Sequence, residues 1–176
     1  MKKLIIASAM ILSVAGTSAM AAPDGTFRQA HEYGYGDKSS LDPASRGRVM
    51  QITEKLMSRL IRPDMKGSPS PDLATSWSAN DSATEWTLKL RSGVSFHEGS
   101  RFEAADVLYT LNRVLDPENK SPARSAIKMI EKMEALDSMT VKFTLSTPFA
   151  DMPLQLMDYR LRIIPEGSGD SIATSG

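Results

Sequence analysis

The chain contains no cysteine, and this absence excludes several classes of site at once. Without thiols there is no disulfide, no thiolate metal site, no cysteine nucleophile and no lipid-modified cysteine to anchor the protein to a membrane. Histidine is scarce as well: His31 and His97 lie far apart in the sequence. A two-histidine metal site is conceivable, but metal ligands normally cluster, so we favour turn or surface positions for both and expect no metal.

An excess of positive charge is also missing, because 21 basic residues balance 21 acidic ones. Nucleic-acid-binding proteins usually show a basic excess, so we expect no nucleic-acid partner. The sequence has no glycine-rich phosphate loop and no nucleophile elbow, and we expect no cofactor. Glu103 and Asp106 could form an acid–base pair, but they stand where a helix begins and its dipole favours negative charge. The sequence therefore predicts a protein that is not an enzyme.

An apolar run near the start of the chain is too short to span a bilayer, which requires roughly 20 residues. Two lysines precede it, it covers residues 4–14, and the small residues Ala19 and Ala21 follow where signal peptidase recognises its substrate. We predict that residues 1–21 are a cleaved signal peptide rather than a membrane anchor or a buried first helix. Cleavage after Ala21 leaves 155 residues (176 minus 21) and removes two lysines, giving 19 basic against 21 acidic residues. We expect a periplasmic protein with no lipid anchor.

Hydrophobic periodicity predicts two β-hairpins and one long helix. In residues 73–91, every second residue near the end is apolar, and Asn80-Asp81-Ser82 supplies turn chemistry. Residues 130–145 predict a second hairpin, whose first arm fits either a short helix or a bulged strand. Residues 103–115 have one apolar face and end at Asp116-Pro117, as a helix would. Because strands and helices do not alternate strictly, we predict an α+β fold rather than a doubly wound parallel sheet.

Weaker signals complete the predicted secondary structure. They are a first strand over 27–35, a helix over about 45–59, a loop at 67–71, a short helix within 149–159 and a short strand over 161–164. The small residues of 166–176 lead to no further element, so we expect the chain to be truncated.

Two residue groups are candidates for binding. The abundant methionines could form an adaptable binding surface, although core filling is commoner and we favour it. The run of aromatic residues and glycines after the first predicted strand fits a ligand contact and a plain turn equally well. This candidate ligand-binding run is Tyr33, Gly34, Tyr35 and Gly36.

Several segments resemble the family 5 extracellular solute-binding proteins, the dipeptide- and oligopeptide-binding group. The resemblance is carried by Pro-Asp-Leu-Ala-Thr-Ser-Trp at 71–77 and by Glu-Trp-Thr-Leu-Lys-Leu-Arg-Ser-Gly-Val-Ser-Phe-His-Glu-Gly at 85–99. Further matching segments follow in the expected order. They are Leu41-Asp42-Pro43, Phe102-Glu-Ala-Ala-Asp-Val, Arg113-Val-Leu-Asp-Pro, Ala135-Leu136-Asp137, Val141-Lys-Phe-Thr-Leu and Ile163-Ile-Pro-Glu.

The resemblance implies the N-terminal part of a two-lobed periplasmic binding protein of the type II or cluster C kind, with an incomplete first lobe and a small extra domain. After the signal peptide at residues 1–21, it assigns residues 22–48 to the first lobe, 49–165 to the small domain and 166–176 to a truncated linker that returns to the first lobe. His97 lies in a turn typical of the family, which favours a structural role for it.

The implied function is that of the substrate-binding subunit of an ABC importer. It would bind small peptides by closing its lobes, as a monomer, and deliver them to permease subunits in the inner membrane. The alternative is another solute of the same family: a nickel chelate, an opine, glutathione, haem or a sugar. The resemblance also favours a ligand role for Tyr33 to Gly36, where family members bring main chain close to the ligand.

Overall fold

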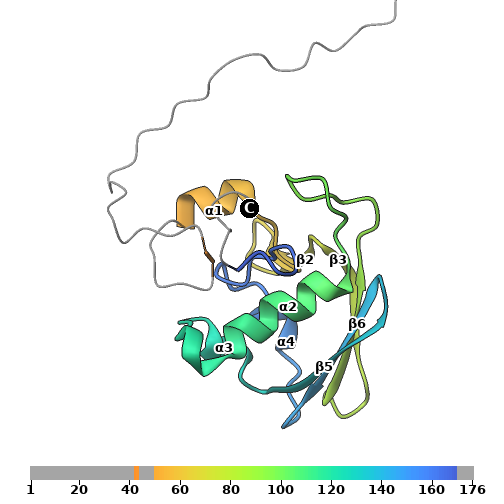
Figure 1. Cartoon of the computed structure of the whole chain (residues 1–176). Coiled ribbons are helices and arrows are strands. Elements are labelled where there is room, and N and C mark those ends of the chain that lie inside the picture. The colour runs from red at the N-terminus through yellow and green to blue at the C-terminus, as the bar shows by residue number, and fades with distance from the viewer. Residues whose placement is uncertain (1–41, 44–49, 170–176) are drawn as a thin grey trace, which may run out of the picture. The chain divides into compact units, whose positions relative to one another are not determined.

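A four-stranded antiparallel sheet is the largest element of the protein (Figure 1). The structure, a computed structural model, describes residues 42–43 and 50–169. The sheet has the order β3-β4-β6-β5, so that two hairpins lie side by side and β4 pairs with β6. Its strands are β3 (Ala74–Ala79), β4 (Glu85–Leu90), β5 (Ile130–Asp137) and β6 (Thr140–Leu145).

The two central strands form the core because alternate residues of each point to the same face. Trp86 lies opposite Phe143 and Leu88 lies opposite Val141. All four side chains are buried, and the indole Nε1 of Trp86 donates to the Phe149 carbonyl. The two hairpins predicted from periodicity are therefore confirmed. In the first turn, the Asn80 side-chain oxygen accepts the backbone N–H groups of Thr84 and Glu85.

Strand β5, at one edge of the sheet, is bulged. Its register against β6 shifts between Ile130 and Lys132 and again between Ala135 and Asp137. Of the two structures that fit the sequence of this arm, the bulged strand is the correct one. The residue spacing suggested a helix because each shift moves side chains out of strict alternation.

Helix α2 (Ala104–Leu115) packs across the sheet and buries Val107, Leu111 and Val114 against it (Figure 1). Its first turn is capped as the acidic residues predicted: the Glu103 N–H donates to Oδ2 of Asp106 at 2.7 Å. It ends at Asp116, as predicted, before a short 3₁₀ turn η1 (Pro117–Asn119) and helix α3 (Arg124–Ile127).

Helix α1 (Met50–Leu56) ends earlier than the sequence predicted. The apolar spacing placed Leu56 and Leu60 on one helical face, but Leu56 is 42% exposed and Leu60 is buried beyond the end of the helix. The reason is a distant side chain. Nη1 of Arg162 donates to the Met57 carbonyl at 2.8 Å and caps the end of the helix there.

Arg59 and Arg162 form an antiparallel bridge that joins the beginning of the described body to its end. Nη1 of Arg59 donates to the Met157 carbonyl at 2.6 Å, just beyond helix α4 (Met152–Gln155). Arg59, which follows α1, thus caps α4, and Arg162, which follows α4, caps α1. Both side chains are buried. Burial lowers the pKa of Arg162, and the charge of Arg59 lowers it further. The short strand predicted over 161–164 is thus a single bridge, and the helix predicted within 149–159 is only α4.

A two-stranded ribbon of β1 (Ile61–Pro63) and β2 (Pro69–Pro71) stands where the sequence predicted a loop. The prolines argued against a strand. Each strand of a two-stranded ribbon has a free edge, however, where the missing N–H of proline costs no ladder bond. Within residues 42–43 and 50–169, every helix falls short of the length and hydrophobicity that crossing a bilayer requires.

The central position of Leu88, which is 0% exposed, makes it a direct test of this core. We expect Leu88→Ala to lower the free energy of unfolding by about 2–5 kcal/mol, because it leaves a cavity between sheet and helix. Ser76→Ala, at an exposed position of β3, is the control and should change it by less than about 0.5 kcal/mol. Denaturant unfolding measures both. Equal effects of the two substitutions would contradict the buried placement of β4.

Candidate functional site

The predicted ligand-binding residues Tyr33, Gly34, Tyr35 and Gly36 lie outside the described residues, as does His31. His97 is described. Its Nε2 lies 3.0 Å from the Leu56 carbonyl, at the end of α1, beside a pocket of about 80 Å³. That pocket is small and mostly apolar, so His97 ties the loop at 92–101 to α1, which agrees with the structural role expected for it.

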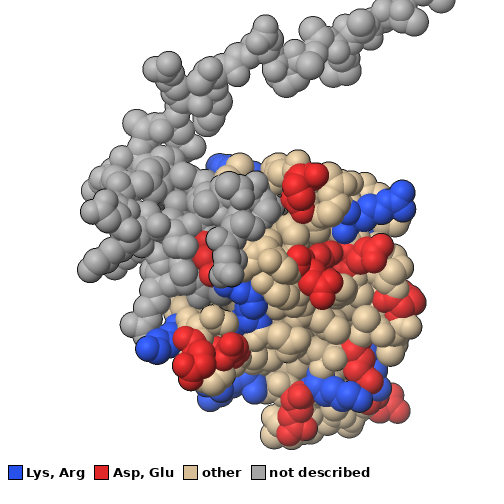
Figure 2. Space-filling model, in the orientation of Figure 1, with Lys and Arg blue, Asp and Glu red and all other residues tan. Residues whose placement is uncertain are grey.

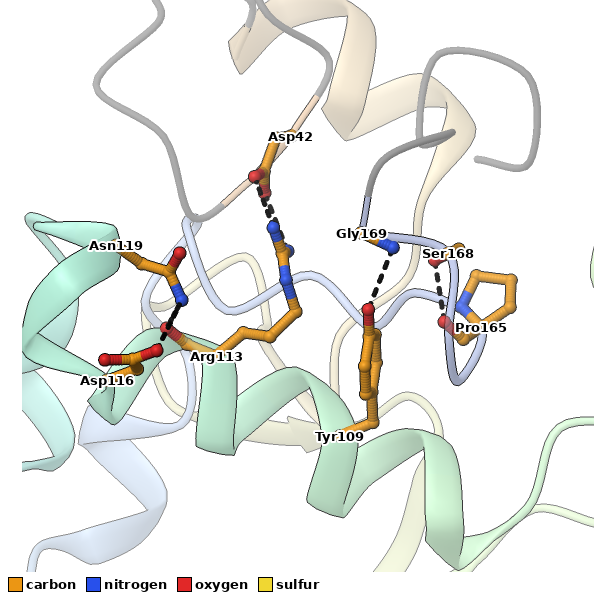
Figure 3. Close-up of polar contacts among 8 residues, drawn as sticks. All are labelled: Asp42, Tyr109, Arg113, Asp116, Asn119, Pro165, Ser168 and Gly169. Atoms are coloured by element: carbon orange, nitrogen blue, oxygen red, sulfur yellow. Dashed lines mark hydrogen bonds and ion pairs between the residues drawn. The ribbon is translucent and has the colours of Figure 1, made fainter.

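Helix α2 carries a stripe of polar side chains that we call the α2 clasp; Figure 3 shows two of its members, Tyr109 and Arg113. Its members follow the spacing i, i+3, i+4 and i+7, which places them on one side of a helix. They hold two segments of chain that flank the sheet and α2 in sequence. Residues 42–43 come before these elements, and residues 164–169 come after them. The α2 clasp consists of Asp106, Tyr109, Thr110 and Arg113.

Arg113 binds the segment before the body. Its guanidinium donates to both carboxylate oxygens of Asp42, at 2.9 and 3.2 Å. The two side chains are only 18% and 21% exposed, and the Arg113 guanidinium carbon lies 6.0 Å from the centroid of the Tyr109 ring. A bidentate, partly buried pair of this kind is fixed in geometry far better than an exposed ion pair.

The other three clasp residues hold the segment after the body. Thr110 Oγ1 donates to the Ile164 carbonyl at 3.3 Å and accepts the Ile164 N–H at 3.1 Å. The Tyr109 hydroxyl accepts the Gly169 N–H at 2.8 Å (Figure 3). A Cβ at Gly169 would lie only 2.8 Å from that hydroxyl, so any larger residue would force the Tyr109 side chain to shift. The two segments are therefore held along the same helix.

Asp106 belongs to both the start of α2 and the clasp. Its Oδ2 accepts the Glu103 N–H, and its Oδ1 accepts the Glu166 N–H at 2.8 Å. Burial raises the pKa of Asp106 above its ordinary value, because the two backbone bonds compensate the lost hydration of the carboxylate only in part.

An open groove of about 690 Å³ lies along the clasp, between α2 and the edge strand β5. Charged side chains of both signs are scattered over this face of the molecule, with uncharged residues between them (Figure 2). The polar residues that line it are able to form hydrogen bonds and ion pairs. The lining residues are Ala105, Leu108, Tyr109, Asn112, Arg113, Asp116, Ala135 and Glu166.

A second polar cluster joins α4 to the segment before α3. Arg160 donates from Nε to Oδ1 of Asp158 at 2.8 Å and from Nη1 to the Pro122 carbonyl at 2.7 Å. Burial raises the pKa of Asp158, but the bonds from Arg160 outweigh it and hold that pKa below its ordinary value. Among the described residues, no group of three or more histidine, aspartate or glutamate side chains is placed to hold a metal ion.

Sequence reasoning did not find the clasp, because its partners are 54 to 71 residues apart. The polar spacing of residues 106, 109, 110 and 113 on a predicted helix was the available signal. It marks one polar stripe but not the segments that the stripe contacts.

Residues 68–175 match the family model described as "Bacterial extracellular solute-binding proteins, family 5 Middle". Among curated proteins, the glutathione-binding protein GsiB of Pectobacterium atrosepticum is 45% identical over 78 residues, which are 44% of this chain and 15% of that relative. The chain thus spans a small share of the curated relatives it matches.

Solved structures give the same result. AgaA from A. tumefaciens R10, in complex with agropinic acid, matches with a TM-score of 0.66 and 36% identity over 74% of this chain and 27% of that one. The periplasmic binding protein DppA from Helicobacter pylori, in complex with the peptide STSA, matches with a TM-score of 0.66 and 29% identity over 77% and 30%. These neighbours are two-lobed periplasmic binding proteins, so both the predicted α+β fold and the family resemblance are confirmed.

Asp106 and Asp158, whose pKa values shift in opposite directions, predict opposite responses to acid. We expect Asp106→Asn to lower the free energy of unfolding by about 1–3 kcal/mol near pH 7, because asparagine can accept only one of the two N–H bonds through oxygen. The folded-state pKa of Asp106 is raised, so the folded chain binds more protons. The difference in the free energy of unfolding between the unmutated chain and Asp106→Asn should therefore grow as the pH falls from the raised folded-state pKa toward 3.8, the ordinary pKa of an aspartate.

Asp158→Asn is the matched control. The folded-state pKa of Asp158 is lowered below the ordinary value of 3.8. Its ionised carboxylate therefore contributes fully to the free energy of unfolding above pH 3.8, and this contribution is lost as the pH falls through the folded-state pKa. Denaturant unfolding of all three chains between about pH 7 and pH 3 measures both trends. Parallel curves for the two variants would contradict the burial of Asp106.

Proposed function

The chain belongs to the family 5 bacterial extracellular solute-binding proteins, and on that premise we propose that it serves as part of the substrate-binding subunit of an ABC importer. The observation that carries the proposal is the match of residues 68–175 to the family model, which covers β2, the sheet and α2. The function is binding, closure around a solute and delivery to permease subunits in the inner membrane. No bond is made or broken in the solute.

Peptides are the proposed solutes. The structural match to DppA, which was solved with the peptide STSA, supports them. A peptide presents a regular series of N–H and C=O groups, which binding proteins recognise through their own main chain while water fills the side-chain pockets. Tyr33 to Gly36 remain the proposed contacts, since glycines let main chain approach a ligand closely.

A second candidate is another solute of the same family, and two observations favour it. The curated relative that is 45% identical is a glutathione-binding protein, and the structure that is 36% identical was solved with agropinic acid. Nickel chelates, haem and sugars belong to the same alternative. Calorimetry with a mixed peptide library, glutathione and an opine, on the gene product that carries this chain, distinguishes these candidates.

We assign residues 22–48 to the first lobe, 49–165 to a small additional domain and 166–176 to a linker that returns to the first lobe. The α2 clasp supports this division, because it holds Asp42 and Gly169 on one helix at the two borders of the body. With both borders fixed to α2, the body would move as one piece with the lobe that these segments enter. Closure on the solute would then take place elsewhere in the protein.

Binding of a solute is expected to need more than this chain contains, because the chain covers only 27–30% of the solved structures AgaA and DppA. We predict that residues 22–176 alone give no measurable heat with short peptides in titration calorimetry. The control is the same titration with a complete relative such as DppA. Tight peptide binding by residues 22–176 would refute the proposed dependence on a second lobe.

Export is proposed to depend on residues 1–21, with cleavage after Ala21. We expect the intact mass of the exported chain to correspond to a first residue Ala22. Ala21→Leu should abolish cleavage, because a bulky side chain does not fit the position that signal peptidase recognises, whereas Ala7→Leu, within the apolar run, should leave it intact. An unprocessed chain in the cytoplasm would contradict both the signal peptide and the periplasmic location.

A further inference from the structure

The turn between β1 and β2 displays a methionine in solvent. The side chain of Met65 has a relative exposure of 105%, whereas Met57 and Met152 are 6% and 0% exposed. Four others, whose side chains the structure also describes, are partly buried against the core: Met129, Met133, Met139 and Met157. Among the seven methionines with described side chains, Met65 alone has a thioether fully open to water.

The turn that carries Met65 is fixed by bonds in which its side chain takes no part. Oδ1 of Asp64 accepts the N–H groups of Lys66 and Ser68, both at 2.8 Å. The Asp64 N–H donates to the Ser68 carbonyl at 2.9 Å, and Gly67 has a φ of +82°, which glycine adopts without strain. The sequence therefore needs aspartate and glycine in this turn but places no structural demand on the thioether.

An exposed thioether is a nucleophile for oxidants that carry a weak O–O bond. Its sulfur attacks one oxygen of hydrogen peroxide, an S–O bond forms and the O–O bond breaks. The sulfur loses two electrons, and the departing hydroxide takes up the proton of the transferred oxygen and leaves as water. The product is methionine sulfoxide, and its formation depends on access of the oxidant to the sulfur.

We propose that Met65 is an oxidation site, at which peroxides convert the thioether to a sulfoxide without loss of the fold. Oxidation of Met57 or Met152 would place a polar oxygen inside the core, where a polar group without a partner is costly. At Met65 the new oxygen lies in water, so the folded chain tolerates it. The same exposure makes the sulfoxide accessible to reductases, so the modification is reversible.

Tryptic peptides separate the two key methionines. Met65 falls in Leu60–Lys66, because the bond before Pro63 resists trypsin, and Met57 falls in Leu56–Arg59. The folded chain is treated with hydrogen peroxide, and sulfoxide is measured over time by tandem mass spectrometry, which also separates Met152 from Met157 within their shared peptide Phe143–Arg160. We expect the initial rate at Met65 to exceed those at Met57 and Met152 by about tenfold or more.

Two controls make the result specific to the fold. In guanidinium, the rates at the three methionines should converge, which shows that burial and not local sequence separates them. The Met65→Leu variant should lose the fast reaction while its other peptides keep their rates. The oxidised chain and the untreated chain should unfold at the same denaturant concentration. Oxidation of Met57 or Met152 as fast as Met65 in the folded chain, or an earlier unfolding midpoint after oxidation of Met65 alone, would overturn the proposal.

Discussion

The bridge between Arg59 and Arg162 is the constraint on which the described body depends, because it closes the chain on itself. Each arginine follows one short helix and donates to a carbonyl at the end of the other, so that α1 and α4 are held by reciprocal bonds. Both guanidiniums are buried, and Nη2 of Arg162 has no hydrogen-bond partner within the described residues. Burying two like charges is unfavourable. The carbonyls at the helix ends, which carry partial negative charge, offset that cost in part.

The sheet and α2 lie within this closure and supply the hydrophobic core. Beyond them the α2 clasp fixes the borders of the body, with Arg113 on one side and Tyr109 and Thr110 on the other. Core and clasp thus use adjacent faces of one helix: Val107, Leu111 and Val114 pack on the sheet, and the neighbouring clasp residues, of which Asp106 and Thr110 are also buried, hold chain. The same helix therefore both closes the core and holds the chain at the two borders.

Local sequence patterns were sufficient wherever one element determines its own structure. The alternation around Trp86 and Leu88 and the apolar face of 103–115 gave the hairpin and α2 correctly. The pattern failed where a distant group decides. Helix α1 ends at Leu56, where the guanidinium of Arg162, more than 100 residues later in the chain, donates a hydrogen bond to the Met57 carbonyl. Likewise nothing near Arg113 indicates Asp42, and the ribbon at 61–71 was missed because prolines hid its pairing. Tyr33 to Gly36 lie outside the described residues and remain a prediction.

The irregular edge strand β5 has a consequence for how the protein behaves in a crowded compartment. An open sheet edge is a template onto which the strand of another molecule can add. In β5 the two register shifts break the straight row of N–H and C=O groups, and Glu131, Lys132 and Glu134 place charges along it. The strand of a neighbouring molecule would therefore meet an irregular row of backbone hydrogen-bonding groups and charged side chains along this edge. The bulges and charges of β5 therefore disfavour edge-to-edge pairing of sheets from two molecules, which is the first step toward a fibril.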